Sequence, residues 1–475
     1  MATLMSRRQF LGTTLRGAAG ATVGSSLLTL LGSCRGESAV DRPNVLFIAI
    51  DDLNDWVTHL GGHPQARTPN IDALADRGVS FTNAHCSAPS CNPSRASMLT
   101  GVRPSTSGVY DNRQPLREAM PDAVTLPQAF RQAGYRVTGR GKIFHGRYPD
   151  DASWDEYIPK GGEPRPAPGD FPLNGIPNTG NFDWGPLDVS EDEMDDAKVA
   201  QWCVEQIEAG SNRPFFLACG FFRPHLRWYA PRKYFDMFPV DEIILPNVNE
   251  NDLDDIPEQG RKFSGGQDHE AVTSTDNWQR AVQGYLACGA FVDAQVGKVL
   301  DALYASPYAD NTIVVLWSDH GWHLGEKLHW RKFALWEEAT HSPLIFSVPG
   351  MTPTGQRCAR TVTALSVYPT LSELCGLQPP EGQLEGVSLR PLLEDPAAEW
   401  GRPAVTTWLR GNHAVRSEGW RYIRYSDGGE ELYDEVNDPL EWTNLAGEAR
   451  FDDVKRDLAR WLPERNAPDA PHEGD

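Results

Sequence analysis

The sequence is short of positive charge. Lys and Arg total 44 residues against 65 Asp and Glu, and the formal net charge at pH 7 is −21. A protein whose main partner is nucleic acid needs a basic surface to neutralise phosphates, so this composition argues against that class. An acidic protein that takes an anionic substrate needs local groups of Lys or Arg to overcome its own field.

The sequence also lacks cysteines spaced as in zinc sites, and it lacks long apolar runs. The eight cysteines include no Cys-x-x-Cys pair and no zinc-type spacing, and their positions assign no disulfide. Beyond the N-terminus, no segment has the ~20 apolar residues that cross a bilayer. What is present is 40% hydrophobic and 10% aromatic residues over 475 positions, which is typical of a globular chain with one large domain and a smaller one.

The N-terminus has the pattern of an export signal. Residues 6–11, Ser-Arg-Arg-Gln-Phe-Leu, match a twin-arginine signal, and a stretch rich in small and apolar residues follows. It ends in Leu-Gly-Ser-Cys at Cys34, which resembles a lipoprotein cleavage box; ordinary signal cleavage nearby is the alternative. We expect a signal over 1–34, a linker over 35–41, and an exported protein that is periplasmic or held at the membrane only by a lipid on Cys34.

Continuous apolar runs predict buried parallel strands. They lie at 45–50, 215–218 and 313–317, with a weaker run at 135–138. Helical patterns lie between them, including a stripe of apolar residues at intervals of three or four over 282–303. Strands that alternate with helices favour an α/β fold, in which helices cover both faces of a large, mostly parallel sheet.

Two segments and the C-terminal part do not follow this alternation. Residues 147–189 and 241–275 are polar and predict long irregular excursions. Alternating residues over 420–434 indicate a small antiparallel sheet, which a terminal helix follows. We expect a catalytic domain over 42–376 and a smaller α+β subdomain over 377–475.

Candidate metal-binding side chains follow two of the predicted strands, at the point where each strand ends. Asp51 and Asp52 follow the first strand, and Asp319 and His320 follow the strand that ends at residue 317. Ligands of open parallel sheets bind beyond the carboxyl ends of the strands, so we expect these side chains to lie together. Three carboxylates suit Ca²⁺ or Mg²⁺, while the imidazole leaves Zn²⁺ or Mn²⁺ open. A lone Asp after a strand is often a helix N-cap, but clustered carboxylates need a counter-ion.

Residues 91–101, Cys-Asn-Pro-Ser-Arg-Ala-Ser-Met-Leu-Thr-Gly, form the most specific segment. Pro93 fits the first position of a helix and Gly101 its end, which places Cys91 just before the helix, where backbone N–H groups favour an anion. Arg95 lies one turn on and can donate back towards position 91. Taken alone, Cys91 is either a low-pKa catalytic thiol or a buried structural cysteine.

This segment resembles the signature of the sulfatase family, which is Cys-x-Pro-Ser-Arg followed after three residues by Leu-Thr-Gly. Other segments that look like sulfatase segments are 68–72, 125–127, 141–145, 318–322 and 438–441. The chain is most similar to the iduronate-2-sulfatase branch, on Lys142 to His145, Asp319-His320 and Trp330 to Lys332. The resemblance implies an alkaline-phosphatase-like fold.

The resemblance also implies a sulfuric ester hydrolase that acts on a sulfated saccharide. Cys91 would be converted to formylglycine by a formylglycine-generating enzyme or an equivalent. The implied ligands of Ca²⁺, with Mg²⁺ as the alternative, are Asp51, Asp52, Cys91, Asp319 and His320.

The same resemblance implies roles for the remaining site residues. Arg95 would hold the alkoxide of residue 91, and Lys142 and Lys332 would neutralise sulfate oxygens. His225 would protonate the leaving alcohol and His145 would accept a proton from the second hydroxyl. Weaker candidates for the substrate rim are His63, Tyr110, Asn112, Arg113 and His329; of these, Arg113 would pair with a uronate carboxylate.

Two other functions fit the same residues. Formylglycine and this metal site also serve a phosphonate or phosphodiester hydrolase on the same scaffold. The other alternative is a binding protein and not an enzyme: a surface lipoprotein that binds sulfated glycans without hydrolysing them.

Overall fold

An eight-stranded sheet organises the fold, with strand order β13-β2-β12-β9-β1-β7-β4-β5. The central strand β1 (Asn44–Asp51) is buried throughout and runs parallel to both of its neighbours, β7 (Phe215–Pro224) and β9 (Thr312–Ser318). The sheet is completed by β4 (Arg136–Gly141), β5 (Glu156–Pro159), β12 (Leu344–Ser347), β2 (Val79–Phe81) and β13 (Gln356–Cys358). Only β12 pairs antiparallel with its neighbours, so the predicted mostly parallel sheet is confirmed.

The structure is a computed structural model that describes residues 42–146, 148–167 and 169–473. The predicted signal over 1–34, with Cys34, and the predicted linker over 35–41 lie outside the described residues. Among the described residues, no helix is both long and apolar enough to pass through a bilayer.

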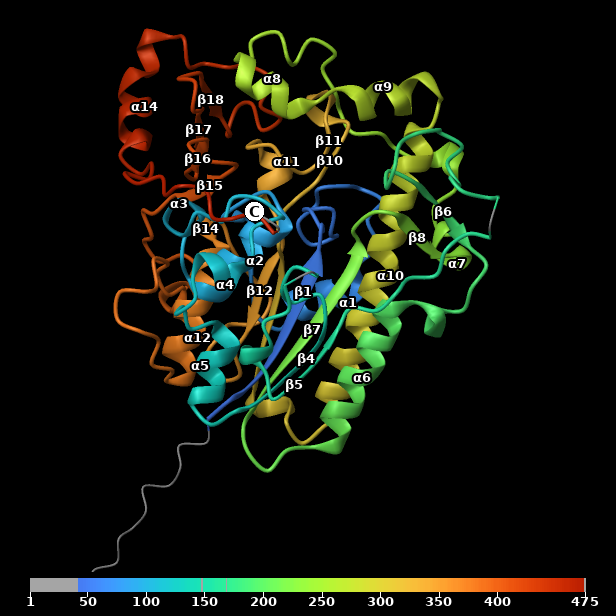
Figure 1. The fold of residues 1–475 in the computed structure, drawn as a ribbon, viewed down its shortest axis with the longest axis vertical. Helices are drawn as coiled ribbons and strands as arrows, with labels where there is room; N and C mark the ends of the chain where they lie inside the picture. The colour runs from blue at the N-terminus through green and yellow to red at the C-terminus, as the bar shows by residue number, and fades with distance from the viewer. Residues whose placement is uncertain (1–41, 147, 168, 474–475) are drawn as a thin grey trace, which may run out of the picture. The chain divides into compact units, whose positions relative to one another are not determined.

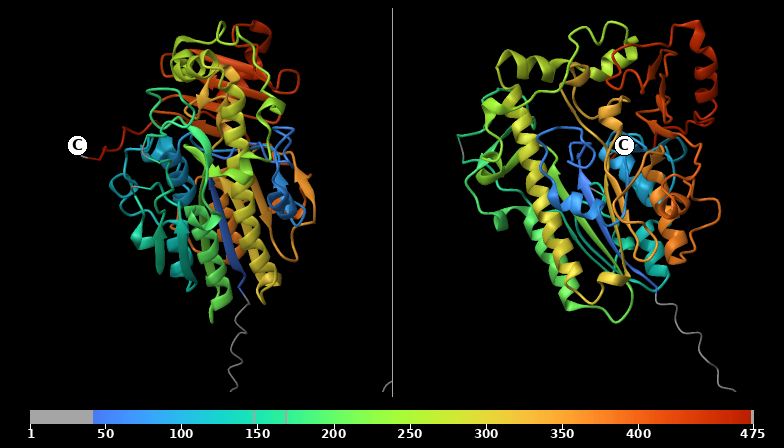
Figure 2. Two further views of the ribbon diagram at one scale, coloured as in Figure 1. Left: turned by 90° about the vertical axis from the view of Figure 1, so that its right-hand side faces the viewer. Right: turned by 180° about the vertical axis from the view of Figure 1, so that it is seen from behind.

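Helices cover both faces of the sheet, and alternate residues of β1 point to opposite layers. Leu46, Ile48 and Ile50 pack with α1 (Pro69–Ala75), α6 (Asp195–Ala209) and α10 (Trp278–Tyr304). Residues 45, 47 and 49 pack with α2 (Cys91–Thr100), α5 (Leu126–Gln132) and α12 (Val367–Cys375). Figures 1 and 2 show the two helical layers on either side of the sheet. Because both faces of β1 are buried, residues 45–50 form a continuous apolar run.

The predicted C-terminal sheet is also present. It consists of β15 (Ala404–Thr407), β16 (His413–Arg416), β17 (Trp420–Arg424) and β18 (Glu430–Asp434), all antiparallel. The helix α14 (Asp452–Ala459) packs Leu458 against it.

The remaining elements are short. The strands are β3 (Ala84–His85), β6 (Trp184–Leu187), β8 (Trp228–Pro231), β10 (His323–Leu324), β11 (Trp330–Arg331) and β14 (Val362–Thr363); the α-helices are α3 (Pro104–Ser107), α4 (Leu116–Ala119), α7 (Arg232–Phe235), α8 (Glu258–Ser264), α9 (Gln267–Ser274), α11 (Glu337–Thr340) and α13 (Arg390–Glu394); and the 3₁₀ turns are η1 (Asp151–Ser153), η2 (Glu191–Glu193), η3 (Val240–Glu242), η4 (Ala309–Asn311), η5 (Glu326–Leu328), η6 (Ala364–Ser366) and η7 (Ala449–Phe451).

Both predicted irregular excursions contain regular structure, so those two predictions are wrong in part. Residues 241–275 hold α8 and α9, and residues 147–189 hold β5 and β6. The two helices together bury only Gly260, Ser264 and Val272, so they carry no apolar periodicity that could reveal them in the sequence.

Asp293 on α10 caps the start of α1. Its carboxylate accepts hydrogen bonds from the backbone N–H groups of Asn70 (3.0 Å) and Ile71 (2.8 Å) and from the Asn70 side chain (2.7 Å). Asp293→Ala should lower the free energy of unfolding by about 2 kcal/mol, because buried donors lose their acceptor. Denaturant unfolding checks this, with Asp301→Ala, exposed on the same helix, as the control. Equal losses in the two variants would contradict the capping role.

Candidate active site

Helix α2 begins two residues earlier than the sequence predicts. Ser90 is the N-cap, its carbonyl accepts from the Ser94 N–H (3.0 Å), and Cys91 is the first helical residue. The prediction that Pro93 takes the first position is therefore wrong; it lies third, where its missing N–H still costs nothing. The Asn112 side chain accepts from the Asn92 N–H (2.8 Å), a long-range contact that supports this earlier start.

The Cys91 side chain is fully buried at the carboxyl ends of the central strands. Its Sγ lies 3.0 Å from Nζ of Lys332, 3.5 Å from Nε2 of His320 and 3.8 Å from Oδ1 of Asp52. Burial alone would raise the pKa of Cys91, but the cations of Lys142 and Lys332 hold it well below its usual value. The position is therefore built to carry negative charge.

Arg95 joins two carboxylates rather than reaching back to residue 91. Its Nη2 lies 3.0 Å from Oδ1 of Asp51 and its Nε lies 2.9 Å from Oδ2 of Asp319, and all three side chains are fully buried. Its Nη1 donates to the backbone carbonyls of Lys142 and Ile143. These contacts hold the carboxylates of Asp51 and Asp319, which are candidate metal ligands, in place. The contact of Arg95 with the alkoxide of residue 91 stays a prediction.

The two lysines supply part of the positive charge that faces these carboxylates. Lys142 Nζ contacts Oδ2 of Asp51, and Lys332 Nζ lies 2.6 Å from Oδ1 of Asp52. Burial opposes a charged amine, but the neighbouring carboxylates raise the pKa of both lysines above the usual value. Both therefore stay charged, close to Cys91.

The carboxylates fit a divalent cation. Ligand atoms of Asp52, Cys91, Asp319 and His320 lie within 4.8 Å of one another, as do those of Asp51, Asp52, Cys91 and His225. Within the part of the chain that the structure describes, Oδ2 of Asp52 is buried without a hydrogen-bond partner. Burial raises the pKa of Asp319 to about 7 even though Arg95 opposes the shift. Both observations indicate too little positive charge for the carboxylates present, which a cation with oxygen ligands would supply.

The backbone at Asp52 is strained. Its φ is +62°, and the β1–β7 register shifts between Ile50 and Asp51, where the strand ends. Such conformations persist in non-glycine residues only when the surroundings hold them, and they gather at functional sites. The strain turns two consecutive carboxylates towards one cluster.

His225 and His145 flank Cys91. Nδ1 of His225 lies 2.7 Å from the Leu226 carbonyl, which fixes its proton there and leaves Nε2 facing Oδ2 of Asp52 at 3.9 Å. The side chain of His225 is 27% exposed, so it also reaches the mouth of the site. Burial lowers the pKa of His145, although its hydrogen bond to Cys91 opposes the shift.

A strained loop presents Lys332. Four non-glycine residues on it have positive φ, namely Lys327, Leu328, Arg331 and Phe333. Buried His329 holds the loop, since its ring nitrogens lie 2.7 Å from the carbonyls of Lys332 and Ser264. Arg331 pairs with Asp268. Ser264 and Asp268 belong to α8 and α9, so the helices that the sequence did not reveal position this lysine.

The other rim candidates take different places. His63 and Tyr110 are buried and bonded to the carbonyls of Ile244 (3.0 Å) and Ala467 (2.9 Å), so the prediction that they line a rim is wrong. His329 is buried beneath the loop of Lys332, and Asn112 supports α2, as described above. The Arg113 side chain is 67% exposed and pairs with Asp111, so its contact with a uronate stays a prediction.

The depressed pKa of Cys91 has a direct spectroscopic consequence. In protein whose residue 91 is still a thiol, kept metal-free with a chelator, we expect thiolate ultraviolet absorbance to persist well below the pH at which an ordinary cysteine protonates. The difference spectrum against Cys91→Ala measures it. Cys86 is the matched control, since burial raises its pKa and Cys86→Ala should remove no such signal. Ionisation of Cys91 only at ordinary thiol pH would contradict the charge arrangement.

Comparisons with known proteins agree with this geometry. The family model described as Sulfatase matches residues 43–377, and that described as N-sulphoglucosamine sulphohydrolase, C-terminal, matches residues 325–467. The chain is 42% identical to a sulfatase of Formosa agariphila over 91% of this chain and 88% of that protein. It is 32% identical to the iduronate 2-sulfatase of Homo sapiens over 75% of this chain and 73% of that protein.

A solved structure supports the fold. The phosphonate monoester hydrolase of Agrobacterium radiobacter superposes with a TM-score of 0.73 at 25% identity, over 88% of this chain and 94% of that chain. Its similarity, together with the sheet order, confirms the architecture that the resemblance implied.

Proposed function

The chain belongs to the sulfatase family, and we propose that it removes sulfate from a sulfated carbohydrate with residue 91 as the nucleophile. The observation that carries this proposal is the position of Cys91. It lies at the start of α2, beside two charged lysines, two histidines and the carboxylates of Asp51, Asp52 and Asp319.

Two groups complete the proposed chemistry. Conversion of Cys91 to formylglycine would supply an aldehyde whose hydrate offers a hydroxyl for attack on sulfur and a second hydroxyl for the later release of sulfate. A divalent cation, which we propose to be Ca²⁺ with Mg²⁺ as the alternative, would act as a Lewis acid between Asp51, Asp52, Asp319 and His320.

The chain's own side chains then have distinct tasks. Lys142 and Lys332 neutralise the sulfate oxygens as their charge grows, because both ammonium groups already lie close to residue 91. His225 acts as an acid in its doubly protonated form: it gives the proton on Nε2 to the leaving alcohol and keeps the proton on Nδ1, which the Leu226 carbonyl holds. His145 accepts a proton from residue 91, and its lowered pKa keeps the imidazole in the neutral form that is able to accept.

For the substrate we propose a 2-O-sulfated uronic acid unit. The relative of Homo sapiens is an iduronate 2-sulfatase, and the segments of Lys142, Asp319 and Lys332 resemble that branch. We also propose that the chain is exported, which the twin-arginine pattern at residues 6–11 supports.

The first test is the state of residue 91 in protein from the native host. Trypsin cleavage at Arg77 and Arg95 releases residues 78–95, which contain both Cys86 and Cys91. We expect mass spectrometry to show an aldehyde at 91 and a thiol at 86, which serves as the control within the same peptide. A thiol at both positions in active protein would contradict the proposed nucleophile.

The second test compares sulfate esters with phosphorus esters, because the phosphonate monoester hydrolase shares the fold. We expect turnover of a 2-O-sulfated uronic acid disaccharide to exceed that of phosphonate monoesters and phosphodiesters. Dominant phosphorus ester turnover would favour the other hydrolase. Binding of sulfated glycan without any turnover by aldehyde-bearing, metal-loaded protein would favour the glycan-binding lipoprotein.

His225→Gln tests the proton donor. We expect kcat to fall by about 10²–10³ on a sugar sulfate, whose alcohol must be protonated, and by less than about tenfold on nitrophenyl sulfate, whose phenolate leaves unaided. Steady-state kinetics on both esters measures the contrast. His413→Gln, in the C-terminal sheet, is the control and should leave the ratio of the two rates unchanged. Equal losses on both esters would reject the role of His225.

A further inference from the structure

A second groove lies in the C-terminal part, away from the residues of the active site. It has a volume of about 520 Å³ and runs between the segment before β15, the turn between β16 and β17, and the end of α14. The side chains that line it include two tryptophans, two arginines and two carboxylates: Trp400, Trp461, Arg360, Arg402, Glu399 and Glu418. None of these residues contributes to the cluster around Cys91.

Among the described residues, Trp461 is not part of the apolar cluster that joins α14 to the C-terminal sheet. Leu458, Val454 and Ala459 of α14 pack in the apolar cluster of the C-terminal sheet, while Trp461 follows the helix and is 43% exposed. Trp400 is half-buried and packs against the main core. Two large aromatic side chains that border one groove with exposed surface are typical of a ligand site.

The groove is already shaped. Arg360 Nη1 lies 3.1 and 3.2 Å from the two carboxylate oxygens of Glu418, while its Nη2 and Nε donate to the carbonyls of Ala397 (2.8 Å) and Ala398 (2.9 Å). This single guanidinium joins three segments of the rim, so a ligand would not have to order them.

Arg402 differs from Arg360. Within the described part of the chain, its side chain makes no hydrogen bond or ion pair, and it is exposed at the rim. It therefore offers an unpaired guanidinium beside the aromatic walls, on a protein whose net charge would otherwise repel an anionic polymer.

We propose that this groove binds a sulfated saccharide chain. A pyranose ring presents an apolar face that fits against Trp461 and Trp400, and a sulfate on it pairs with Arg402. The groove would then give the polymer a second contact besides the active site. The proposal rests on the proposed function, because it takes the polymer to be the substrate of the active site.

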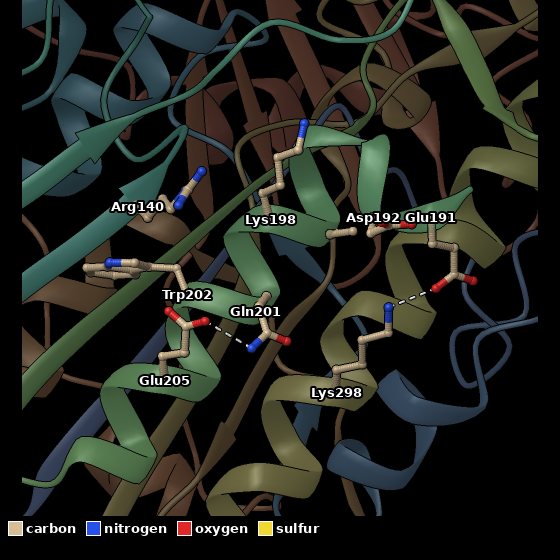
Figure 3. A pocket seen from close by; sticks show the side chains of 9 residues that line it. Arg140, Glu191, Asp192, Lys198, Gln201, Trp202, Glu205 and Lys298 are labelled. Atoms are coloured by element: carbon tan, nitrogen blue, oxygen red, sulfur yellow. Dashed lines mark hydrogen bonds and ion pairs between the residues drawn. The ribbon is translucent and has the colours of Figure 1, made fainter. Parts of the chain in front are cut away.

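The pocket in Figure 3 lacks these features. It has a volume of about 490 Å³ and lies beside α6 and α10. Lys298 pairs with Glu191 at 2.7 Å, and Gln201 donates to Glu205 at 3.0 Å, so much of its polar lining is already used. Its aromatic residue, Trp202, is only 7% exposed and offers little surface for stacking.

Binding is measured separately from turnover. In the full chain carrying Cys91→Ala, titration calorimetry with heparin, ulvan and ι-carrageenan oligosaccharides gives Kd without hydrolysis. We expect Trp461→Ala and Arg402→Ala each to weaken binding of at least one of these about tenfold. Trp442→Ala is the matched control, since Trp442 is 39% exposed but lies outside the groove, and should leave Kd unchanged.

Activity completes the test. With intact residue 91, Trp461→Ala should raise KM for the sulfated chain and leave kcat/KM for a small aryl sulfate unchanged. Equal Kd for the parent, Trp461→Ala and Trp442→Ala would overturn the proposal, as would no binding of any of the three chains. Equal binding of the desulfated chains would overturn the role of Arg402. Failure of the proposed sulfatase function is a separate outcome, because the parent protein would then not turn over the aryl sulfate.

Discussion

Arg95 ties the carboxyl ends of β1 and β9 together at the centre of the molecule. Its guanidinium pairs with Asp51 from one strand and Asp319 from the other, and none of the three side chains reaches water. Ion pairs removed from water are costly unless the geometry satisfies every charge, and removing one partner typically costs 3–5 kcal/mol. These ion pairs therefore fix the position of α2 at the carboxyl ends of the central strands, and with it the position of residue 91.

A second charge network connects the C-terminal sheet to the loop of Lys332. Glu337 on α11 pairs with Arg416 and Arg421 from neighbouring strands, and Arg421 also pairs with Glu441 at 2.5 Å. The carboxylates of Glu337, Glu435 and Glu441 lie close enough to hold a metal, but the two guanidinium groups already occupy their oxygens. Lys327, at the start of the strained loop, pairs with Asp252 and donates to the Glu441 carbonyl. The smaller sheet is thus part of the support of the active site.

The sequence predicted those features that depend on local pattern and on sheet topology. The apolar runs located β1, β7 and β9 because both faces of these strands are buried, and parallel pairing brought the residues that follow them together. Features that depend on distant contacts were missed. Asn112 helps to start α2 early, Ser264 and Asp268 hold a loop more than 60 residues away in sequence, and α8 and α9 have no apolar stripe. His329 was expected at a rim, because an imidazole that bonds two backbone carbonyls has the same sequence signal as one that binds substrate.

The complete burial of Cys91 sets an order of events in the life of the chain. Its thiol lies beneath Lys332, and that lysine is held by segments that follow Cys91 by more than 170 residues in sequence. An enzyme that converts this side chain to an aldehyde has to hold it in its own active site, which the finished fold does not permit. Chemical maturation as proposed must therefore come before the fold closes, while residues 258–333 are not yet packed over the nascent helix. A chain that folds before it is modified keeps its thiol. The time available for modification is therefore set by the folding rate and not by the affinity of the modifying enzyme for the folded protein.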